Sequence, residues 1–489
     1  MVQPALSTKI FVHAPALVNP YRSTKAPGTT PTSSENAFDG AISEQVKTDG
    51  AMDLTRDERE VLDGSLGEIP RKLLLTMVRF GEAMDAERLV PVEGPGHLVI
   101  PESKPGVGAR TEFLESLVDA GVRAALPFTA DPATILNETL SDLTDEQRER
   151  LARAYPMEVR YREALTKLGL RDAGGLTCTP WFEEVANRPS YGQIVAWAES
   201  SAVVYANSVI GARTHRNPGI IDLISNVVGK TPLAGLLTDE GRRASWLVEV
   251  EAAGPINGQV LGYLIGREVG DGIPWVTGLA DMLEGGEHPA SGKFLRDFGT
   301  NASVGGGVGL FHVEGVTVEA KRYGRRLIRD DARRLTIDAG EIESVGTSLR
   351  ADRPVEELRP NKVLLGCPHL TYDQLCAWTD AVESGLARAG RDRLAVETVF
   401  VAAPEVVSRF RAEHPGFAAL ALAGGHVGSF CLEAFMQDPI LAPACVVTNS
   451  NKLRYYSRNV YMLDDEALLR VMVTGGTGAA AGGSDGGHS

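Results

Sequence analysis

The sequence predicts an α/β protein with several domains and mostly parallel sheets. Strand-like and helix-like segments alternate along the body of the chain, a pattern that favours parallel strands covered by helices. The 489 residues leave room for about three domains of ordinary size. Apolar residues make up 43% of the chain and charged residues 23%. This composition is globular and argues against a fibrous or broadly disordered protein.

The alternation is visible from the start of the body. Residues 54–62 have the apolar spacing of a helix, and Thr55 with Glu58 three residues later forms a capping box. A second helix is expected after Pro70, and the runs AERLVPV and GHLVIP are expected to be short strands. Farther on, FLESLVDAGVRAALPF predicts a helix that ends at Gly121 and is followed by a strand.

The clearest strand-to-helix unit is KVLLGCPHLTYDQLCAWTDAV, which predicts a buried strand, a loop and a helix. In parallel sheets, ligands bind in the loops that follow the carboxyl ends of strands. We therefore expect the functional residues of this chain to lie in such loops.

Both ends of the chain are predicted to be flexible. Residues 1–51 form an arm that is rich in Pro, Ser, Thr and Gly and has no apolar periodicity. Residues 475–489 are a low-complexity tail of Gly and Ala. The function is expected between them, in residues 52–474, which should form two to three α/β subdomains. The amino terminus has no apolar block followed by a cleavage site, so no secretory signal is expected.

Charge and hydropathy argue against nucleic acid and membranes as partners. The chain has 49 Lys and Arg against 64 Asp and Glu, a net charge of −15 that offers no cationic excess to a phosphate backbone. The longest strongly apolar run, residues 417–423, is far shorter than the roughly 20 residues that span a bilayer. Five scattered cysteines do not form a disulfide framework, which predicts a reducing, cytoplasmic location.

Three of the five cysteines lie in loop-like contexts and are candidate metal ligands. They are Cys178 in GGLTCTPW, Cys367 in LLGCPHL and Cys431 in GGHVGSFCLEAF. Thiolates hold iron or zinc only where several converge in space. Intervals of 189 and 64 residues leave open whether these three converge or are small buried hydrophobes. Cys376, in a helix-like segment, and Cys445, in an apolar run, are expected to be structural.

Two other motifs suggest chemistry that their context does not favour. Cys367 with His369 resembles a nucleophile and its base, but neighbouring residues at a strand end usually point apart. The glycine-rich stretch from Gly305 to Gly309 resembles a dinucleotide-binding loop, but it precedes a strand-like run instead of opening a helix. We expect a tight, close-packed turn there.

Polar residues are interleaved with Ala and Val in IVAWAESSAVVYANSVIGARTHRNPG. This pattern fits a buried helix whose ends offer hydrogen bonds to an anionic ligand, and it equally fits an ordinary buried helix with satisfied caps. Its polar residues are Glu199, Ser200, Ser201, Asn207, Ser208, Arg213, Thr214 and Arg216. After the apolar run ACVV, Ser450 and Lys452 in TNSNKLRYY either bind a carboxylate or belong to a solvated loop.

Taken together, these stretches resemble the large subunit, or catalytic domain, of the aconitase X family. The matching segments run in order from about residue 52 to residue 456: LTRDEREVLDG, GEAMDAERLVPV, LTCTPW, IVAWAESSAVVYANSVIGART, GKTP, LFHVEGVTVEA, KVLLGCPHL and TNSNKLRYY. The match at WAESSAVVYANSVIGART is long and specific. The resemblance implies an aconitase-like fold, with several α/β/α domains around a central cleft.

The resemblance also implies a cofactor and an activity. Cys178, Cys367 and Cys431 would hold an iron-sulfur cluster or a mononuclear iron with one position open to a substrate hydroxyl. The activity would be that of a hydro-lyase that dehydrates a small hydroxy carboxylate, with cis-3-hydroxy-L-proline or a related compound as the favoured substrate. The alternatives are the large subunit of a mevalonate 5-phosphate dehydratase, and a non-catalytic subunit or scaffold that retains the fold.

Roles for individual residues follow from the same resemblance. The catalytic candidates are Ser450, Lys452 and Glu199. The substrate-binding candidates are Ser200, Ser201, Asn207, Ser208, Arg213, Thr214, Arg216 and His97. Family members also need a small swivelling domain that carries a catalytic serine, and neither residues 1–51 nor the residues after 474 resemble it. The resemblance therefore implies a separate small subunit, and a heterodimer.

Overall fold

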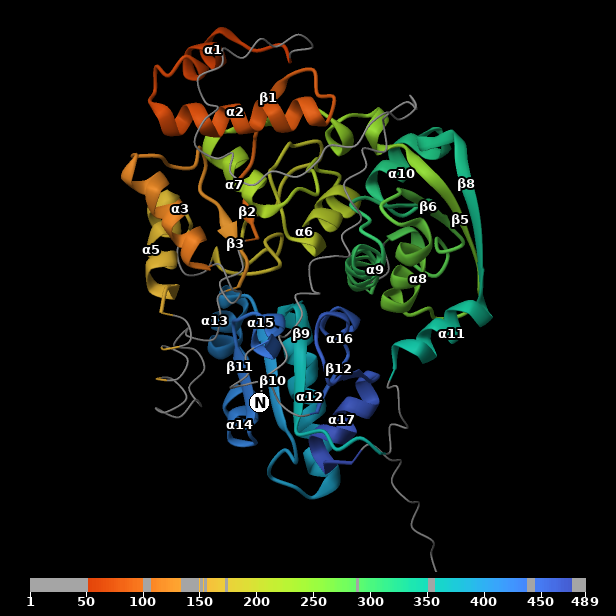
Figure 1. Ribbon diagram of the computed structural model, residues 1–489. Helices are drawn as coiled ribbons and strands as arrows, with labels where there is room; N and C mark the ends of the chain where they lie inside the picture. The colour runs from red at the N-terminus through yellow and green to blue at the C-terminus, as the bar shows by residue number, and fades with distance from the viewer. Residues whose placement is uncertain are drawn as a thin grey trace, which may run out of the picture.

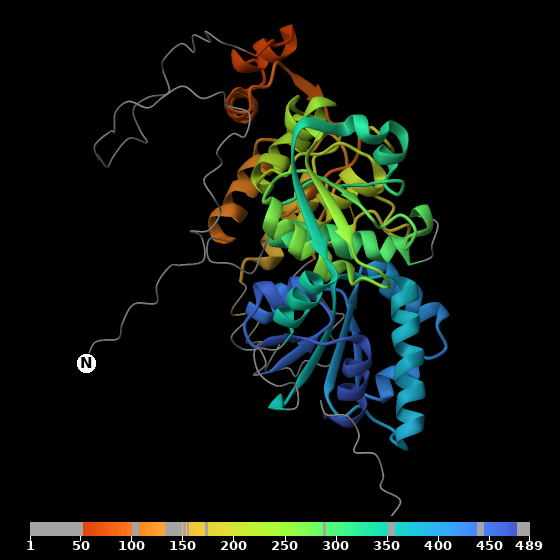
Figure 2. The same cartoon turned by 90° about the vertical axis from the view of Figure 1, so that its right-hand side faces the viewer.

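The chain folds into three α/β units, which the computed structural model arranges with the third beneath the other two (Figures 1 and 2). The described residues are 52–99, 107–132, 149, 153, 156–171, 175–286, 290–350, 357–437 and 445–476. The predicted arm lies outside them, as does all of the predicted tail except Gly475 and Gly476. The α/β class predicted from the sequence is confirmed, with the long sheets of the second and third units entirely parallel.

The first unit, residues 52–242, is mainly helical, and its strands are two or three residues long. Its elements are α1 (Arg56–Leu62), α2 (Glu68–Ala83), β1 (Leu89–Pro91), β2 (His97–Leu98), α3 (Val107–Asp119), β3 (Thr129–Ala130), α5 (Glu158–Leu168), α6 (Ser200–Tyr205), the π-helix η2 (Ala206–Ile210), α7 (Gly219–Val228), β4 (Lys230–Pro232), η3 (Gly235–Leu237) and η4 (Glu240–Arg242). β1 pairs antiparallel with β4, and β2 pairs parallel with β3. The capping box of Thr55 and Glu58 is formed as predicted.

The prediction of a strand in RAALPF is wrong. Only Thr129 and Ala130, just beyond that run, form a strand, and Phe128 makes an isolated bridge to Leu170. Within RAALPF, Arg123 and Ala125 are exposed and Leu126 is only partly buried, so the run does not present a continuous apolar face to a sheet.

The second unit, residues 244–350, contains a four-stranded parallel sheet in the order β7-β6-β5-β8. Its elements are β5 (Ala244–Glu251), α8 (Gly258–Val269), β6 (Pro274–Thr277), η5 (Glu284–Gly286), α9 (Ser291–Gly305), β7 (His312–Val313), α10 (Val318–Tyr323), η6 (Gly324–Leu327), β8 (Ile328–Asp338) and α11 (Ala339–Leu349). Helices α8 and α9 approach very closely, because Gly258, Gly262 and Gly266 on α8 lie directly against the α9 backbone.

The third unit, residues 357–476, contains a five-stranded parallel sheet in the order β11-β10-β9-β12-β13. Its elements are β9 (Lys362–Leu370), α12 (Tyr372–Ala389), β10 (Glu397–Ala402), α13 (Pro404–Glu413), α14 (Phe417–Leu422), β11 (Gly425–Gly428), α15 (Leu432–Gln437), β12 (Val446–Thr448), α16 (Asn451–Tyr456), β13 (Val460–Met462) and α17 (Asp465–Thr474). The strand order reverses between β9 and β12. Open parallel sheets bind ligands at the carboxyl ends of the strands flanking such a switch point.

One hydrophobic core joins the first unit to the third. Trp181, Trp197 and Val203 pack in the same cluster as Leu365 of β9 and Val447 of β12. Helix α6 also packs against α9 of the second unit, so it lies where the three units meet (Figure 1). The amino-terminal end of α6 is thereby held against the switch point of the third sheet.

Candidate functional site

The candidate site lies at the carboxyl ends of β9 and β12. Cys367 stands near the end of β9, and Ser450 and Lys452 follow β12 directly. Ser450 caps α16 by accepting a hydrogen bond from the Leu453 N–H at 3.1 Å, and its hydroxyl donates to the Cys367 carbonyl oxygen. The two loops of the switch point are therefore tied together.

A buried ion pair joins this edge to the first unit. The Lys452 ammonium pairs with the Glu199 carboxylate, and both residues are buried. Glu199 also caps α6, accepting from the Ser201 N–H at 3.2 Å and the Ser201 hydroxyl at 2.8 Å; the Ser200 hydroxyl lies 3.4 Å away. Burial acts to raise the pKa of Glu199, but Lys452 and Ser201 lower it to about 2. Burial acts to lower the pKa of Lys452, but Glu199 and nearby thiols hold it well above its usual value. Both groups are therefore charged.

Two of the three candidate cysteines, Cys178 and Cys367, lie close to this ion pair, and the third, Cys431, lies close to Cys367. Cys178 and Cys367 each interact electrostatically with Lys452 and with each other, and Cys431 interacts with Cys367. Each thiol retains some access to solvent. Nevertheless, enough protein surrounds them for burial to raise all three pKa values, that of Cys367 to about 12.

Their donor chemistry fits an iron-sulfur group. The His369 N–H donates to the Cys178 sulfur at 3.3 Å, and the Ala434 N–H donates to the Cys431 sulfur at 3.4 Å. Backbone N–H donors of this kind stabilise metal-bound sulfur. Within the described ranges, however, no three His, Cys, Asp or Glu side chains are grouped closely enough to hold one metal ion.

Arg216 is the cation that remains open beside this ion pair. Its side chain is accessible to solvent, yet surrounding protein lowers its pKa by burial, against the raising influence of Tyr456, Asp271 and Glu199. Its guanidinium lies against the glycine-rich turn, because a Cβ at Gly307 would be 2.8 Å from Arg216 Nη1. In the part of the chain that the structure describes, it makes no hydrogen bond or ion pair. Tyr456 interacts electrostatically with Lys452 and with Arg216. It was not predicted as a site residue, although its i+4 spacing from Lys452 places the two side chains on the same face of the helix.

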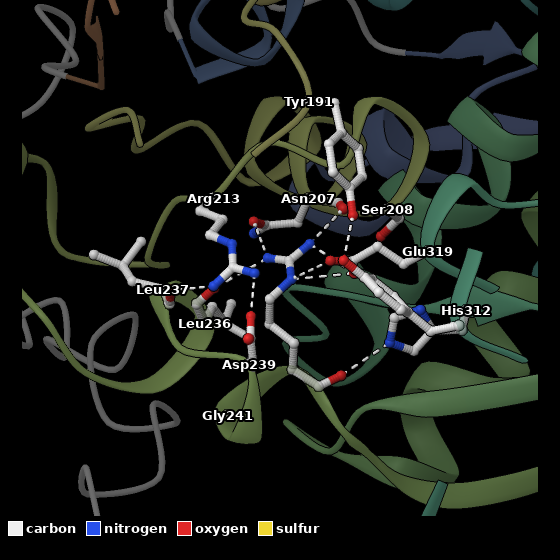
Figure 3. A network of polar contacts seen from close by, with 12 residues as sticks. Tyr191, Asn207, Ser208, Arg213, Leu236, Leu237, Asp239, Gly241, His312 and Glu319 are labelled. Atoms are coloured by element: carbon white, nitrogen blue, oxygen red, sulfur yellow. Dashed lines mark hydrogen bonds and ion pairs between the residues drawn. The ribbon is translucent and has the colours of Figure 1, made fainter. Parts of the chain in front are cut away.

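Four other predicted residues are engaged away from the ion pair, and three of them, Asn207, Ser208 and Arg213, are labelled in Figure 3. The Asn207 side chain bonds backbone groups of Thr214 and Gly309, and the Ser208 hydroxyl accepts from the Phe311 N–H. The Thr214 hydroxyl accepts from the Trp197 N–H. The Arg213 guanidinium pairs with Asp239 and donates to the Leu237 carbonyl at 2.6 Å. The structure thus does not bring these four side chains together with Glu199 and Lys452.

His97, Cys376 and Cys445 are the remaining residues singled out by the sequence. His97 is fully buried and bonds Thr129 through Nδ1 at 2.9 Å, with Nε2 3.7 Å from Asp131. Burial lowers the pKa of His97 to about 4, while Glu199 acts to raise it, so the ring is neutral. Cys376 and Cys445 pack at the margin of the core shared by the first and third units.

Taken with its strand-end thiols and buried acid–lysine pair, this architecture defines a multidomain α/β enzyme of the aconitase type. Residues 51–240 match the aconitase X first domain, and residues 244–346 match the aconitase X second domain. The solved holo-form of aconitase X from Thermococcus kodakaraensis superposes with a TM-score of 0.71 at 28% identity, covering 86% of this chain and all of that one. The chain belongs to the aconitase X family.

The relatives named for their activity are dehydratases. The phosphomevalonate dehydratase large subunit of Thermococcus kodakarensis is 32% identical over 327 residues, which are 66% of this chain and 75% of that protein. The cis-3-hydroxy-L-proline dehydratase of Pseudomonas aeruginosa is 29% identical over 431 residues, 85% of this chain and 68% of that protein. The predictions of the family, the aconitase-like fold and a hydro-lyase are confirmed. None of the described helices is long and apolar enough to cross a membrane.

Proposed function

We propose that this protein is an iron-dependent hydro-lyase that removes water from a small hydroxy carboxylate of the hydroxyproline type. The observation that carries the proposal is the charged Glu199–Lys452 pair, which lies beside Cys178 and Cys367 at the switch point. Such a buried charge pair costs desolvation free energy, and it is rarely retained for stability alone.

Cys178, Cys367 and Cys431 would hold the iron-sulfur cluster, with a mononuclear iron as the alternative. Bound there, the group would supply a Lewis acid for the departing hydroxyl. Metal binding requires deprotonated thiols. Because burial raises the pKa of each thiol, the metal-free site holds them protonated, and loading should release protons.

The chain's own residues would bind and orient the substrate. Arg216 offers an uncommitted guanidinium fork to the substrate carboxylate. Lys452, kept protonated by Glu199, would donate a hydrogen bond from Nζ to the leaving oxygen. The same elimination needs a base for the proton on the neighbouring carbon. We assign that base to a serine on a separate small subunit, which would also cover the site around Cys367 and Lys452 and exclude water.

The charged side chains near Glu199 and Lys452 support a substrate with one carboxylate. Lys452 is paired with Glu199, Arg213 with Asp239, and Arg216 remains open. A substrate that carries both phosphate and carboxylate demands more converging cations.

The second candidate substrate is mevalonate 5-phosphate, favoured by the 32% identity to the phosphomevalonate dehydratase large subunit, whose name also supports a small-subunit partner. The five free thiols support a reducing, cytoplasmic location.

The test is a dehydratase assay of the anaerobically prepared protein, alone and with a small swivelling-domain subunit, on cis-3-hydroxy-L-proline and on mevalonate 5-phosphate. We expect turnover of the first substrate, and only with the subunit present. Arg216→Ala should lower kcat/KM by about 10- to 150-fold, the equivalent of one charge-assisted contact of about 1.5–3 kcal/mol.

Arg325→Ala is the matched control, because Arg325 is a surface arginine paired with Glu314, and it should keep full activity. Turnover of mevalonate 5-phosphate instead would reassign the substrate. Robust activity of the chain alone would place the base within it, at Ser450 or Ser201. No turnover of either substrate by an iron-loaded complex would refute the proposal.

A further inference from the structure

The π-helix η2 leaves the Asn207 carbonyl without a helical partner. At its end the N–H groups of Gly211 and Ala212 both reach back to the Ala206 carbonyl. The Asn207 carbonyl is instead bonded by Arg242 Nη2 at 2.8 Å, from an element 35 residues away in the chain. Local π-helical turns are frequent at functional sites, so what this turn positions is informative.

Arg242 uses all five of its N–H donors, and their partners Asn207, Leu236 and Glu319 are labelled in Figure 3. Nε and Nη2 donate to the Glu319 carboxylate at 2.8 and 2.9 Å. Nη1 donates to Asn207 Oδ1 and to the Leu236 carbonyl, both at 3.0 Å. The fifth N–H is the Nη2 contact to the Asn207 carbonyl. A lysine has three donors and no planar fork, so it cannot reproduce this set.

The Arg242–Glu319 pair is almost fully buried, with 1% and 3% of the two residues exposed. Burying two charges costs desolvation, and buried pairs of this kind are weak evidence for stability. The Arg242 carbonyl is itself fixed, because it bonds His312 Nε2 at 2.9 Å. Arg242 therefore gives Asn207 a rigid support that is braced by Glu319 of the second unit.

Asn207 transmits that support toward Arg216. Its Oδ1 accepts from the Thr214 N–H at 3.0 Å, and its Nδ2 donates to the Thr214 carbonyl at 2.9 Å, so it clamps both backbone groups two residues before Arg216. Nδ2 also donates to the Gly309 carbonyl at 3.0 Å. The same glycine-rich turn touches Arg216, since a Cβ at Gly307 would lie 2.8 Å from Arg216 Nη1. One amide thus fixes the backbone that carries Arg216 and the turn against which its guanidinium lies.

We propose that Arg242, braced by Glu319, is a positioning residue: through Asn207 it fixes the Thr214–Arg216 segment and so aims Arg216 at the substrate carboxylate. The part of this inference that concerns substrate rests on the proposed function. The part that concerns the segment does not, because a rigid clamp alters local exchange whether or not the substrate is the one proposed.

The experiment combines hydrogen exchange with a double-mutant cycle. In Glu319→Gln and Arg242→Lys, backbone amides of residues 206–217 should exchange at least tenfold faster, with exchange in the third unit unchanged. With whichever substrate the wild type turns over, Glu319→Gln or Arg242→Lys should lower kcat/KM about tenfold, mainly by raising KM. In an Arg216→Ala background neither should have a further effect, because the positioned group is gone.

Arg243→Lys is the matched control. Arg243 is the next residue, partly exposed and bonded to Glu240 and the Ile328 carbonyl, and its exchange and kinetics should match the wild type. Glu319→Gln keeps the shape of the clamp if Arg242→Lys fails to fold. Unchanged exchange in 206–217, or losses that add fully to those of Arg216→Ala, would overturn the assignment. Absence of turnover in the wild type would refute the proposed function while the exchange result still decides the clamp.

Discussion

The close contact between α8 and α9 makes a sharp prediction for Gly262→Ala. Alanine favours a helix over glycine by about 1 kcal/mol, so the substitution should stabilise an isolated α8. In the folded protein, however, a Cβ at Gly262 would overlap the Phe298 carbonyl oxygen and lie 2.9 Å from the Phe298 Cα. Ordinary contacts begin near 3.4 Å, so α9 must move away. Overpacking of this kind costs about 1–3 kcal/mol.

The shift should also reach the site. Asn301 on α9 accepts a hydrogen bond from Asn451 Nδ2 at 2.9 Å, and Asn451 precedes Lys452. Misplacing a positioned group by about 1 Å can cost about 100-fold in rate. Gly262→Ala should therefore lower both the midpoint of urea unfolding and kcat/KM.

The control is Gly346→Ala in α11, where a Cβ would meet Val260 at an ordinary 3.7 Å. This variant should gain about 0.5–1 kcal/mol and keep its activity. Urea unfolding of the metal-free proteins compares the two midpoints directly. A rise in the midpoint of Gly262→Ala equal to that of Gly346→Ala would refute the packing argument.

Three further predictions concern buried charged or titratable groups. Burial raises the pKa of Asp222 well above its usual value, with only Asn217 opposing it. Ionisation of Asp222 therefore destabilises the folded protein above about pH 4. Asp222→Asn should raise the midpoint of urea unfolding at pH 7 but not at pH 3. Burial lowers the pKa of His312 to about 4, so the unfolded chain binds an extra proton between about pH 6.5 and 4, and His312→Gln should flatten the loss of stability over that window. Lys452→Met leaves Glu199 buried and unpaired and should cost about 3–5 kcal/mol, whereas the double variant with Glu199→Gln should lose less than the sum of the two single variants in a urea series.

Local signals in the sequence predicted local structure well. The capping box of Thr55 and Glu58 depends on neighbouring residues and forms as expected. The strand and the helix predicted in KVLLGCPHLTYDQLCAWTDAV also form, but the loop expected around Cys367 does not, because β9 continues to Leu370 and α12 begins at Tyr372. The glycine-rich turn after α9 is close-packed as predicted, because Gly306 lies against the α8 backbone. The prediction of a strand in RAALPF was wrong because an apolar run does not show whether a neighbouring strand is present to pair with it.

The orientation of side chains in the site could not be predicted from periodicity. Arg213 and Arg216 lie in one polar segment, and the sequence treats them alike. The π-turn and the left-handed Gly211, with φ of 77°, redirect the chain after α6, so that Arg213 meets Asp239 while Arg216 remains open. Glu319, 77 residues from Arg242, has no local signal at all, because a buried charge pair is specified only by the tertiary fold.

The most direct test of the central claim is the iron and acid-labile sulfide content of the anaerobically purified protein and its five cysteine-to-serine variants. We expect that the wild type binds iron and sulfide, and that Cys178→Ser, Cys367→Ser and Cys431→Ser each lose most of both. Cys376→Ser and Cys445→Ser should retain the wild-type content. An active wild type without iron, or full iron content in all of the first three variants, would contradict the account.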